Sequence, residues 1–205
     1  MGRITWKPAT GAEWDDLVAL FGPRGACGGC WCMWWRLSRR DFARRKGDGT
    51  RRALRRLVER GPAPGILAYD GERAVGWCCV GPREGFPLLE RSRVLARVDE
   101  EPVWSIVCFF VARDHRHKGL TRRLIAAAVS YAASQGARVV EAYPTDAGAG
   151  QPDAFVYTGI ASAFTSQGFV EVARRSKRRP ILRRSIRRRR PRPAVRSARK
   201  SRPPR

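Results

Sequence analysis

The chain has 205 residues, a mass of about 23 kDa and a formal net charge of +24, from 42 Lys and Arg against 18 Asp and Glu. Hydrophobic residues make up 43% of it, which is enough for one packed domain and excludes a wholly disordered chain. Residues 174–205 hold 17 of the basic residues and no acid, so the preceding residues carry only +7. This asymmetry argues against a uniformly basic nucleic-acid-binding domain.

Membrane and secretion signals are missing from the sequence. The longest apolar run, near residues 103–112, is about half of what a membrane-spanning helix needs. Residues 1–8 lack the apolar core of a signal peptide. We therefore expect a cytoplasmic protein whose six cysteines are mostly reduced thiols.

The first half of the chain predicts a strand, helices and a hairpin. Thr10, followed three residues later by Glu13, is a typical capping box, and Trp14, Leu17 and Phe21 then fall on one helical face. Asp70-Gly71 is a favoured hairpin turn pair between two β-type runs. The expected elements are a strand over 3–7, helices over 10–21, 31–45 and 50–60, and hairpin strands over 65–69 and 73–80.

The second half alternates strands with helices. The continuous apolar run 103–112 indicates a central strand buried on both faces. An Ala-rich apolar stripe predicts a helix over 120–134, with Gly136 ending it. A strand over 138–143, a short helix over 160–167 and strands over 169–174 and 180–184 follow. This order predicts a mixed α/β sheet with helices on its faces.

The loop between the central strand and the following helix is the most informative segment. It reads Arg116-His117-Lys118-Gly119-Leu120-Thr121, so a basic loop with one glycine leads into a helix N-terminus. Unpaired backbone N–H groups, the positive end of the helix dipole and the basic side chains together suit a phosphate group. The glycine pattern fits neither a P-loop nor a dinucleotide fingerprint.

This hexapeptide resembles the Arg/Gln-x-x-Gly-x-Gly/Ala motif of the GNAT acetyltransferase superfamily. The order of elements over residues 3–184 is similar as well, including Ala163–Phe169 near the end. The resemblance implies a mostly antiparallel twisted sheet of six or seven strands in a domain over 1–184, followed by an Arg/Pro-rich tail over 185–205 that we expect to be disordered. Thr121 departs from the family pattern, which prefers Gly or Ala there.

The resemblance also implies acetyl-coenzyme A as co-substrate and transfer of its acetyl group to a primary amine of a small molecule or protein. Backbone groups of Phe109, Phe110 and Val111 would pair with the pantetheine arm. The loop from Arg116 to Thr121, including His117, Lys118, Gly119 and Leu120, would hold the diphosphate.

The catalytic residues are less clearly marked. The family often has a tyrosine acid where this chain has Phe164, so we consider Tyr157, Ser162 and Tyr143 as substitutes. Glu141 is the carboxylate best placed by order to act as base, with Asp99, Glu100 and Glu101 as alternatives. Catalysis by positioning with a water-relayed proton stays open. The missing tyrosine also leaves a second hypothesis, a catalytically weak binding protein of the same fold.

A cysteine and tryptophan cluster over residues 27–35 is the second unusual feature of the sequence. Cys27, Cys30 and Cys32 have spacings seen in zinc and redox sites, but a fourth ligand of suitable spacing is missing. We favour a reduced apolar wall without metal. The family resemblance implies that this segment forms one wall of the acceptor pocket, so Trp31, Trp34 and Trp35 are candidates for contact with the acceptor. We expect two of the three to lie in the core. His115 and His117 are expected to be exposed, and the tail could contact nucleic acid or another polyanion without sequence specificity.

Overall fold

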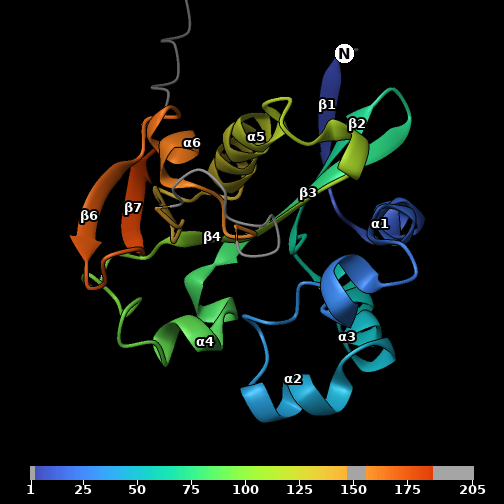
Figure 1. The fold of residues 1–205 in the computed structure, drawn as a ribbon, viewed down its shortest axis with the longest axis horizontal. Coiled ribbons are helices and arrows are strands. Elements are labelled where there is room, and N and C mark those ends of the chain that lie inside the picture. Colours follow the sequence, from blue (N-terminus) through green and yellow to red (C-terminus); the bar gives the residue numbers. More distant parts are fainter. Residues whose placement is uncertain (1–2, 147–155, 187–205) are drawn as a thin grey trace, which may run out of the picture.

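A seven-stranded sheet in the order β1-β2-β3-β4-β5-β7-β6 runs through the molecule (Figure 1). The computed structural model describes residues 3–146 and 156–186. All neighbouring strands pair antiparallel except β4 and β5, which are parallel. The strands are β1 (Ile4–Pro8), β2 (Gly65–Asp70), β3 (Arg73–Pro82), β4 (Trp104–Val111), β5 (Val139–Ala142), β6 (Val170–Arg174) and β7 (Pro180–Ser185). The mixed, mostly antiparallel α/β fold is thus confirmed.

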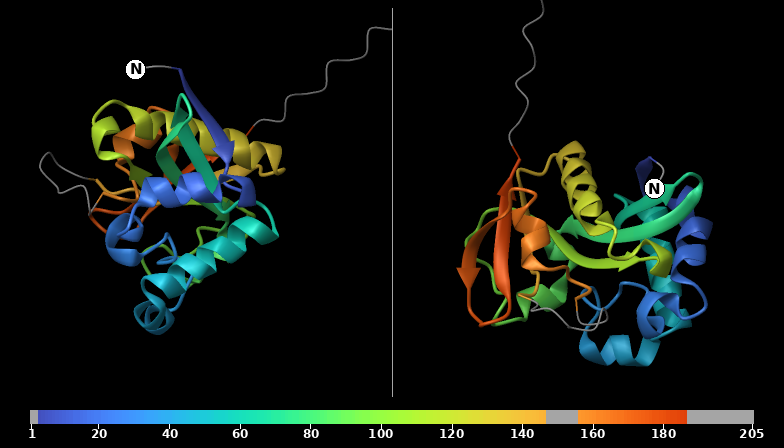
Figure 2. Two further views of the ribbon diagram at one scale, coloured as in Figure 1. Left: turned by 90° about the vertical axis from the view of Figure 1, so that its right-hand side faces the viewer. Right: turned by 45° about the horizontal axis from the view of Figure 1, so that its top comes forward.

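Helices cover both faces of this sheet. On one face lie α5 (Leu120–Ser134) and α6 (Ala161–Thr165), whose apolar residues share a core cluster with the strands. On the other lie α1 (Trp14–Phe21), α3 (Asp48–Arg60) and α4 (Pro87–Glu90). The left-hand view of Figure 2 shows α5 above the strands and α1 below them. Each face of the sheet therefore has its own hydrophobic core.

The first helical segment begins as the sequence predicts. The Thr10 backbone N–H donates to Glu13 Oε2 at 3.1 Å, and Ala12 N–H donates to Thr10 Oγ1 at 3.3 Å, which completes the capping box. A 3₁₀ turn, Gly11–Glu13, then passes into α1. Trp14, Leu17 and Phe21 are buried, as expected.

The expected helix over 31–45 is wrong in its first half. Only α2 (Arg39–Arg45) is helical, with Ser38 as its N-cap accepting from Asp41 N–H at 3.0 Å. Trp31 and Cys32 have φ values of 44° and 52°, in the left-handed region that a right-handed helix does not use. The segment before α2 therefore folds as tight turns, which bury Trp31, Cys32 and Met33.

The central strand β4 contains a β-bulge next to the candidate functional site. Cys79 pairs with Cys108 but Val80 pairs with Ile106, so Val107 is an extra residue in β4. As a result Val107 and Cys108 both pack against the core beneath α1. The parallel pairing with β5 ends at Ile106, and from there to Val111 β4 is paired only with β3. Its outer edge is therefore open to another segment or ligand.

No helix within residues 3–146 and 156–186 is long and apolar enough to cross a membrane.

Candidate functional site

The loop after β4 presents backbone donors at the start of a long helix. A 3₁₀ turn, Arg113–His115, is followed by His117 and Gly119 with φ values of 57° and 75°, and α5 begins at Leu120. No side chain caps this helix, and His117, Lys118 and Gly119 are exposed. A Cβ atom placed on Gly119 would meet nothing within 4 Å. The helix N-terminus is therefore open to an approaching anion.

His115 fixes the start of this loop to the β2–β3 hairpin. Its Nε2 lies 3.1 Å from Asp70 Oδ2 and its Nδ1 lies 3.1 Å from Asp114 Oδ1. The hydrogen bond with Asp70, followed by the interaction with the Asp114 carboxylate, raises the pKa of His115. The hydrogen bond from Arg73 holds the pKa of Asp114 well below its usual range. The expectation that His115 is exposed is wrong, because the hairpin buries it, whereas His117 is exposed as expected.

The open edge of β4 is partly taken by the chain itself. The Phe109 backbone N–H donates to the Tyr157 carbonyl at 2.7 Å. The same segment also pairs with Thr145, which lies three residues after the end of β5. The Thr145 N–H donates to the Gly159 carbonyl at 3.0 Å. Residues 156–160 thus lie between β4 and Thr145, where the two parallel strands have separated.

The backbone of Phe109, Phe110 and Val111 is the part of β4 predicted to pair with a ligand. Their side chains alternate, with Phe110 packing on Phe21 and Phe109 on Phe164. The Val111 carbonyl accepts from Arg116 Nε at 3.2 Å, which holds that guanidinium against the strand. The structure thus brings Phe109–Val111 and Arg116–Thr121 into one continuous strand–loop–helix unit.

Glu141, the predicted base, sits in a buried ion network. Its carboxylate accepts from Arg83 Nη1 at 2.8 Å and from Arg183 Nε at 2.6 Å, and it is fully buried. Tyr143 donates to the same carboxylate at 2.6 Å. Burial, then the Glu141 charge, raises the pKa of Tyr143 well above its usual value. These contacts give Glu141 a structural role, and its catalytic role stays a prediction.

The predicted proton donors differ in their surroundings. Tyr157 is half-buried against the core that contains Cys108, and burial raises its pKa to about 12. Ser162 is exposed on α6. Phe164, where the resemblance would place a tyrosine, is fully buried between Phe109 and Phe169. Of these three side chains, only that of Tyr157 both carries a hydroxyl and packs on the core between the sheet and α1.

One cysteine of the N-terminal cluster, Cys32, contacts β4. Cys32 Sγ lies 3.4 Å from Cys108 Sγ and accepts from Trp77 Nε1 at 2.9 Å. The hydrogen bond with Cys108, then burial, raises the pKa of Cys32 well above its usual value, and burial raises that of Cys30 to about 11. A raised pKa favours the thiol over the more nucleophilic thiolate. Within the described ranges, no three His, Cys, Asp or Glu side chains are placed to hold a metal ion.

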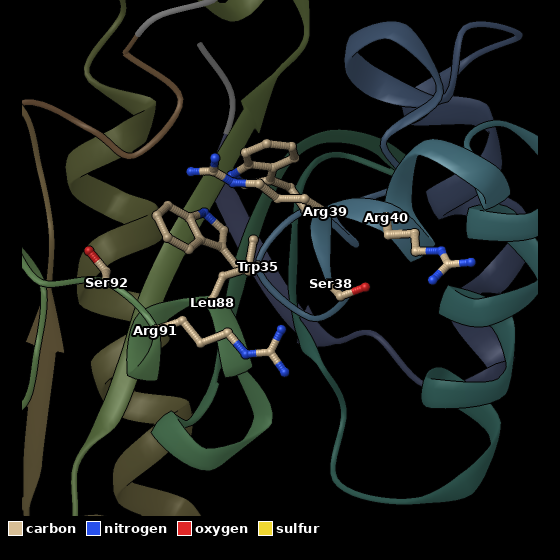
Figure 3. A pocket seen from close by; sticks show the side chains of 8 residues that line it. Trp35, Ser38, Arg39, Arg40, Leu88, Arg91 and Ser92 are labelled. Atoms are coloured by element: carbon tan, nitrogen blue, oxygen red, sulfur yellow. The ribbon is translucent and has the colours of Figure 1, made fainter.

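The three tryptophans occupy different environments. Trp31 is core, stacked on Trp14 with ring centroids 6.0 Å apart, and Trp35 is also buried. Trp34 and Trp35 line a pocket of about 570 Å³ beside α2 and α4, and Trp31 does not (Figure 3). The remaining lining residues are Ser38, Arg39, Arg40, Leu88, Arg91 and Ser92.

Sequence reasoning missed the arginines of this region. Arg39, Arg40 and Arg91 come from two segments about fifty residues apart, and only the fold brings them to one pocket. Arg83 was missed because its partners, Glu90, Glu141 and Tyr143, are mostly distant in sequence. The one sequence signal for the pocket is the mixture of Trp and Arg over residues 34–40.

Comparisons with known proteins agree with this geometry. A family model described as "Acetyltransferase (GNAT) family" matches residues 31–151, which is more than half of the chain. No curated protein matches the chain.

Several solved structures share the fold at low sequence identity. The paia N-acetyltransferase of Thermoplasma acidophilum, in complex with coenzyme A, is 12% identical with a TM-score of 0.51, over 90% of this chain and 99% of that one. The yncA protein of Salmonella typhimurium, with its cofactor acetyl-CoA, is 16% identical with a TM-score of 0.50, over 89% and 93%. An N-acetyltransferase from Staphylococcus aureus Mu50 is 11% identical with a TM-score of 0.51, over 90% and 99%. This chain belongs to the acetyltransferase (GNAT) family, the N-acetyltransferase family that its sequence resembles.

Proposed function

We propose that the protein transfers the acetyl group of acetyl-coenzyme A to a primary amine, by direct attack of the amine in a ternary complex. The observation that carries this proposal is the uncapped, exposed N-terminus of α5 at the end of the open β4 edge. A ligand with both an amide arm and a diphosphate matches these two features together. Two of the structural neighbours described above were solved with coenzyme A or acetyl-CoA.

The loop residues fit the diphosphate of the co-substrate. Gly119 leaves the space above the backbone open, and Arg116, Lys118 and Arg122 supply positive charge around it. Thr121 is half-buried in the first turn of α5, and its hydroxyl adds a donor there. The backbone of Phe109 and Val111 would hold the amide arm, with the Phe109 N–H released from Tyr157.

The chemistry requires a neutral amine, a polarised thioester carbonyl and a proton for the departing thiolate. Acetyl-coenzyme A supplies an activated acyl group, and the chain supplies the positioning. We assign proton donation to Tyr157, because its backbone pairs with Phe109 on β4 and its half-buried side chain carries a hydroxyl next to that strand. Glu141 is held by two arginines, so we assign deprotonation of the amine to a water relay instead of this carboxylate.

The test is release of the coenzyme A thiol from acetyl-coenzyme A in the presence of a panel of primary amines, with the acetylated product identified by mass spectrometry. We expect amine-dependent thiol release that saturates in both substrates, without an acetylated enzyme. Release of thiol in the absence of any amine, with an acetyl group left on the protein, would contradict direct attack.

A second candidate function is ligand binding without efficient transfer, favoured by the fully buried Phe164 in place of a tyrosine. Coenzyme A binding with no transfer to any amine in the panel would support this alternative.

A further inference from the structure

The pocket between α2 and α4 combines arginines with aromatic rings. Trp34 and Trp35 form its apolar wall, and Leu88 and Ser92 come from the α4 side (Figure 3). Arg39 and Arg40 lie on α2, and Arg91 directly follows α4. At about 570 Å³ the cavity has the size of a small-molecule site.

The positive charge around this pocket is uncompensated. Arg39, Arg40 and Arg91 are exposed, and none of them forms an ion pair with any residue in the described ranges. No carboxylate lines the cavity. Three guanidinium groups with no acid between them create a field that attracts an anion.

The acids of α2 and α4, Asp41 and Glu90, already have other partners. Asp41 on α2 accepts from Ser38 Oγ at 2.7 Å and from Arg44 at 2.9 Å. Glu90 on α4 accepts from Arg83 at 2.8 Å and from Arg97 at 3.1 Å. Since both carboxylates have other partners, neither neutralises the pocket arginines.

Trp35 provides an independent sign of a ligand. Its side chain is more than nine-tenths buried and lines the pocket, and its indole Nε1 has no hydrogen-bond partner in the described part of the chain. Buried donors in native structures almost always have an acceptor. An acceptor atom supplied by a ligand, such as a carboxylate or phosphate oxygen, would satisfy this N–H.

The pocket lies close to the part of β4 that we propose to bind the co-substrate. Cys32 Sγ touches Cys108 Sγ at 3.4 Å, and Trp35 follows Cys32 by three residues, a span of at most roughly 11 Å. Leu88 N–H donates to Trp35 O at 3.3 Å, which ties α4 to the same wall. Figure 1 shows α2 and α4 on the side of β4 opposite α5.

From these observations we infer that the acceptor is a small-molecule amine carrying an anionic group, a carboxylate or a phosphate, which the arginines of this pocket bind while Trp34 and Trp35 cover its apolar part. That the ligand is an amine rests on the proposed acetyl transfer. That it carries an anionic group rests on the pocket alone. Guanidinium groups suit both anions because their planar N–H groups match two oxygens at once.

The experiment uses pairs of amines that differ in one anionic group: glucosamine 6-phosphate with glucosamine, and phenylalanine with phenylalaninamide. Affinities are measured by calorimetric titration of the full chain with saturating coenzyme A, so that the anion cannot bind at the α5 loop. We expect at least one anionic member to bind about tenfold or more tightly than its neutral partner. Replacing Arg39 or Arg91 with alanine should abolish that preference.

A matched control is Arg56→Ala, which removes an equally exposed arginine from α3, outside the pocket. It should leave the preference unchanged. Equal affinity within both pairs, or equal loss in the control, would overturn the inference, as would binding of an acidic peptide amine alone.

Binding and transfer separate the two proposals. Arginine-dependent binding of the anion without thiol release would keep the pocket assignment and reject acetyl transfer. Thiol release with neutral amines only would keep acetyl transfer and reject the assignment of the pocket to an anionic acceptor.

Discussion

Tyr157 contributes two different groups to the region beside β4. Its carbonyl accepts from Phe109 N–H, and its hydroxyl, with a pKa of about 12, stays protonated at neutral pH. The sequence could place this residue only near the site by order, since the two contacts depend on how residues 156–160 return to β4. Substitution by phenylalanine separates the two groups, because it removes the hydroxyl and keeps the carbonyl.

For Tyr157→Phe we expect kcat for acetyl transfer to fall by about 10²-fold, with little change in KM, because general acid catalysis contributes about this much. Tyr131→Phe is the matched control, since the Tyr131 hydroxyl donates to Ala63 O within the opposite core. Steady-state kinetics on both variants test this prediction. An unchanged kcat for Tyr157→Phe would show that Tyr157 is not the general acid.

Glu141 shows the opposite relation between sequence and structure. Its place on the strand after α5 made it a candidate base, but only the fold shows Arg83 and Arg183 on its two oxygens. Both partners lie far away in the chain, so no local pattern could reveal them. Removing one member of a buried ion network leaves the other charges unpaired.

Glu141→Gln should therefore lower the free energy of unfolding by about 3–5 kcal/mol. The exposed pair between Arg55 and Glu59 serves as control, and Glu59→Gln should cost much less. Urea unfolding measures both variants. A Glu141→Gln protein of normal stability that has lost acetyl transfer would instead identify Glu141 as a catalytic residue.

At the scale of elements, the local patterns were informative wherever one element's own residues decide its structure. The capping box, the Ala-rich stripe of α5 and the turn between β2 and β3 all formed as predicted. The helix expected over 31–45 failed because Trp31 and Cys32 are drawn into the core under β3 and β4, where Cys32 meets Trp77 and Cys108. Tertiary contacts overrode helical periodicity there.

The two ends of α5 offer a matched pair of glycines. Gly119 and Gly136 have φ values of 75° and 85°, and a Cβ on either would meet nothing within 4 Å. Alanine at either position should cost a similar backbone strain of about 1 kcal/mol. Only Gly119→Ala should also weaken coenzyme A binding, by about tenfold, because its Cβ would face the diphosphate. Calorimetric titration with coenzyme A compares the two, and equal affinities would reject the diphosphate assignment.

The contact between His115 and the β2–β3 hairpin predicts a pH dependence. Because the pKa of His115 is raised in the folded state, its protonation stabilises the fold fully below its ordinary value of 6.5. This contribution is lost as the pH rises through the higher, folded-state value. Thermal unfolding from pH 6 to pH 9 should show falling stability, and His115→Gln should flatten that dependence. If the pH dependence of stability persists in the His115→Gln variant, another titratable group is responsible for it.

At the scale of the whole molecule, the charge divides between the folded domain and its C-terminal extension. The strand β7 ends at Ser185, while residues 187–205 lie outside the described residues, so the predicted disorder of the tail stays a prediction. Within the domain, arginines lie in the loop before α5, in the Glu141 network and around the pocket beside α2. Sequence alone placed the first group and missed the other two.

Truncation after Ile186 should leave acetyl transfer and thermal stability unchanged. It should also weaken binding to single-stranded nucleic acid and reduce the salt dependence of that binding, because ten basic residues are removed. Fluorescence anisotropy with a labelled oligonucleotide at several salt concentrations measures this. If the binding affinities of the full and shortened chains depend equally on salt concentration, the folded domain and not the tail binds the polyanion.

The bond between Phe109 N–H and the Tyr157 carbonyl has a consequence for the measured affinity of the co-substrate. An amide arm that pairs along β4 competes with the protein's own backbone for this donor. The apparent dissociation constant is then the intrinsic one divided by the fraction of molecules in which residues 156–160 have already withdrawn. Changes that loosen this segment should tighten coenzyme A binding without touching it, so residues outside the contact surface can set how much co-substrate the enzyme needs.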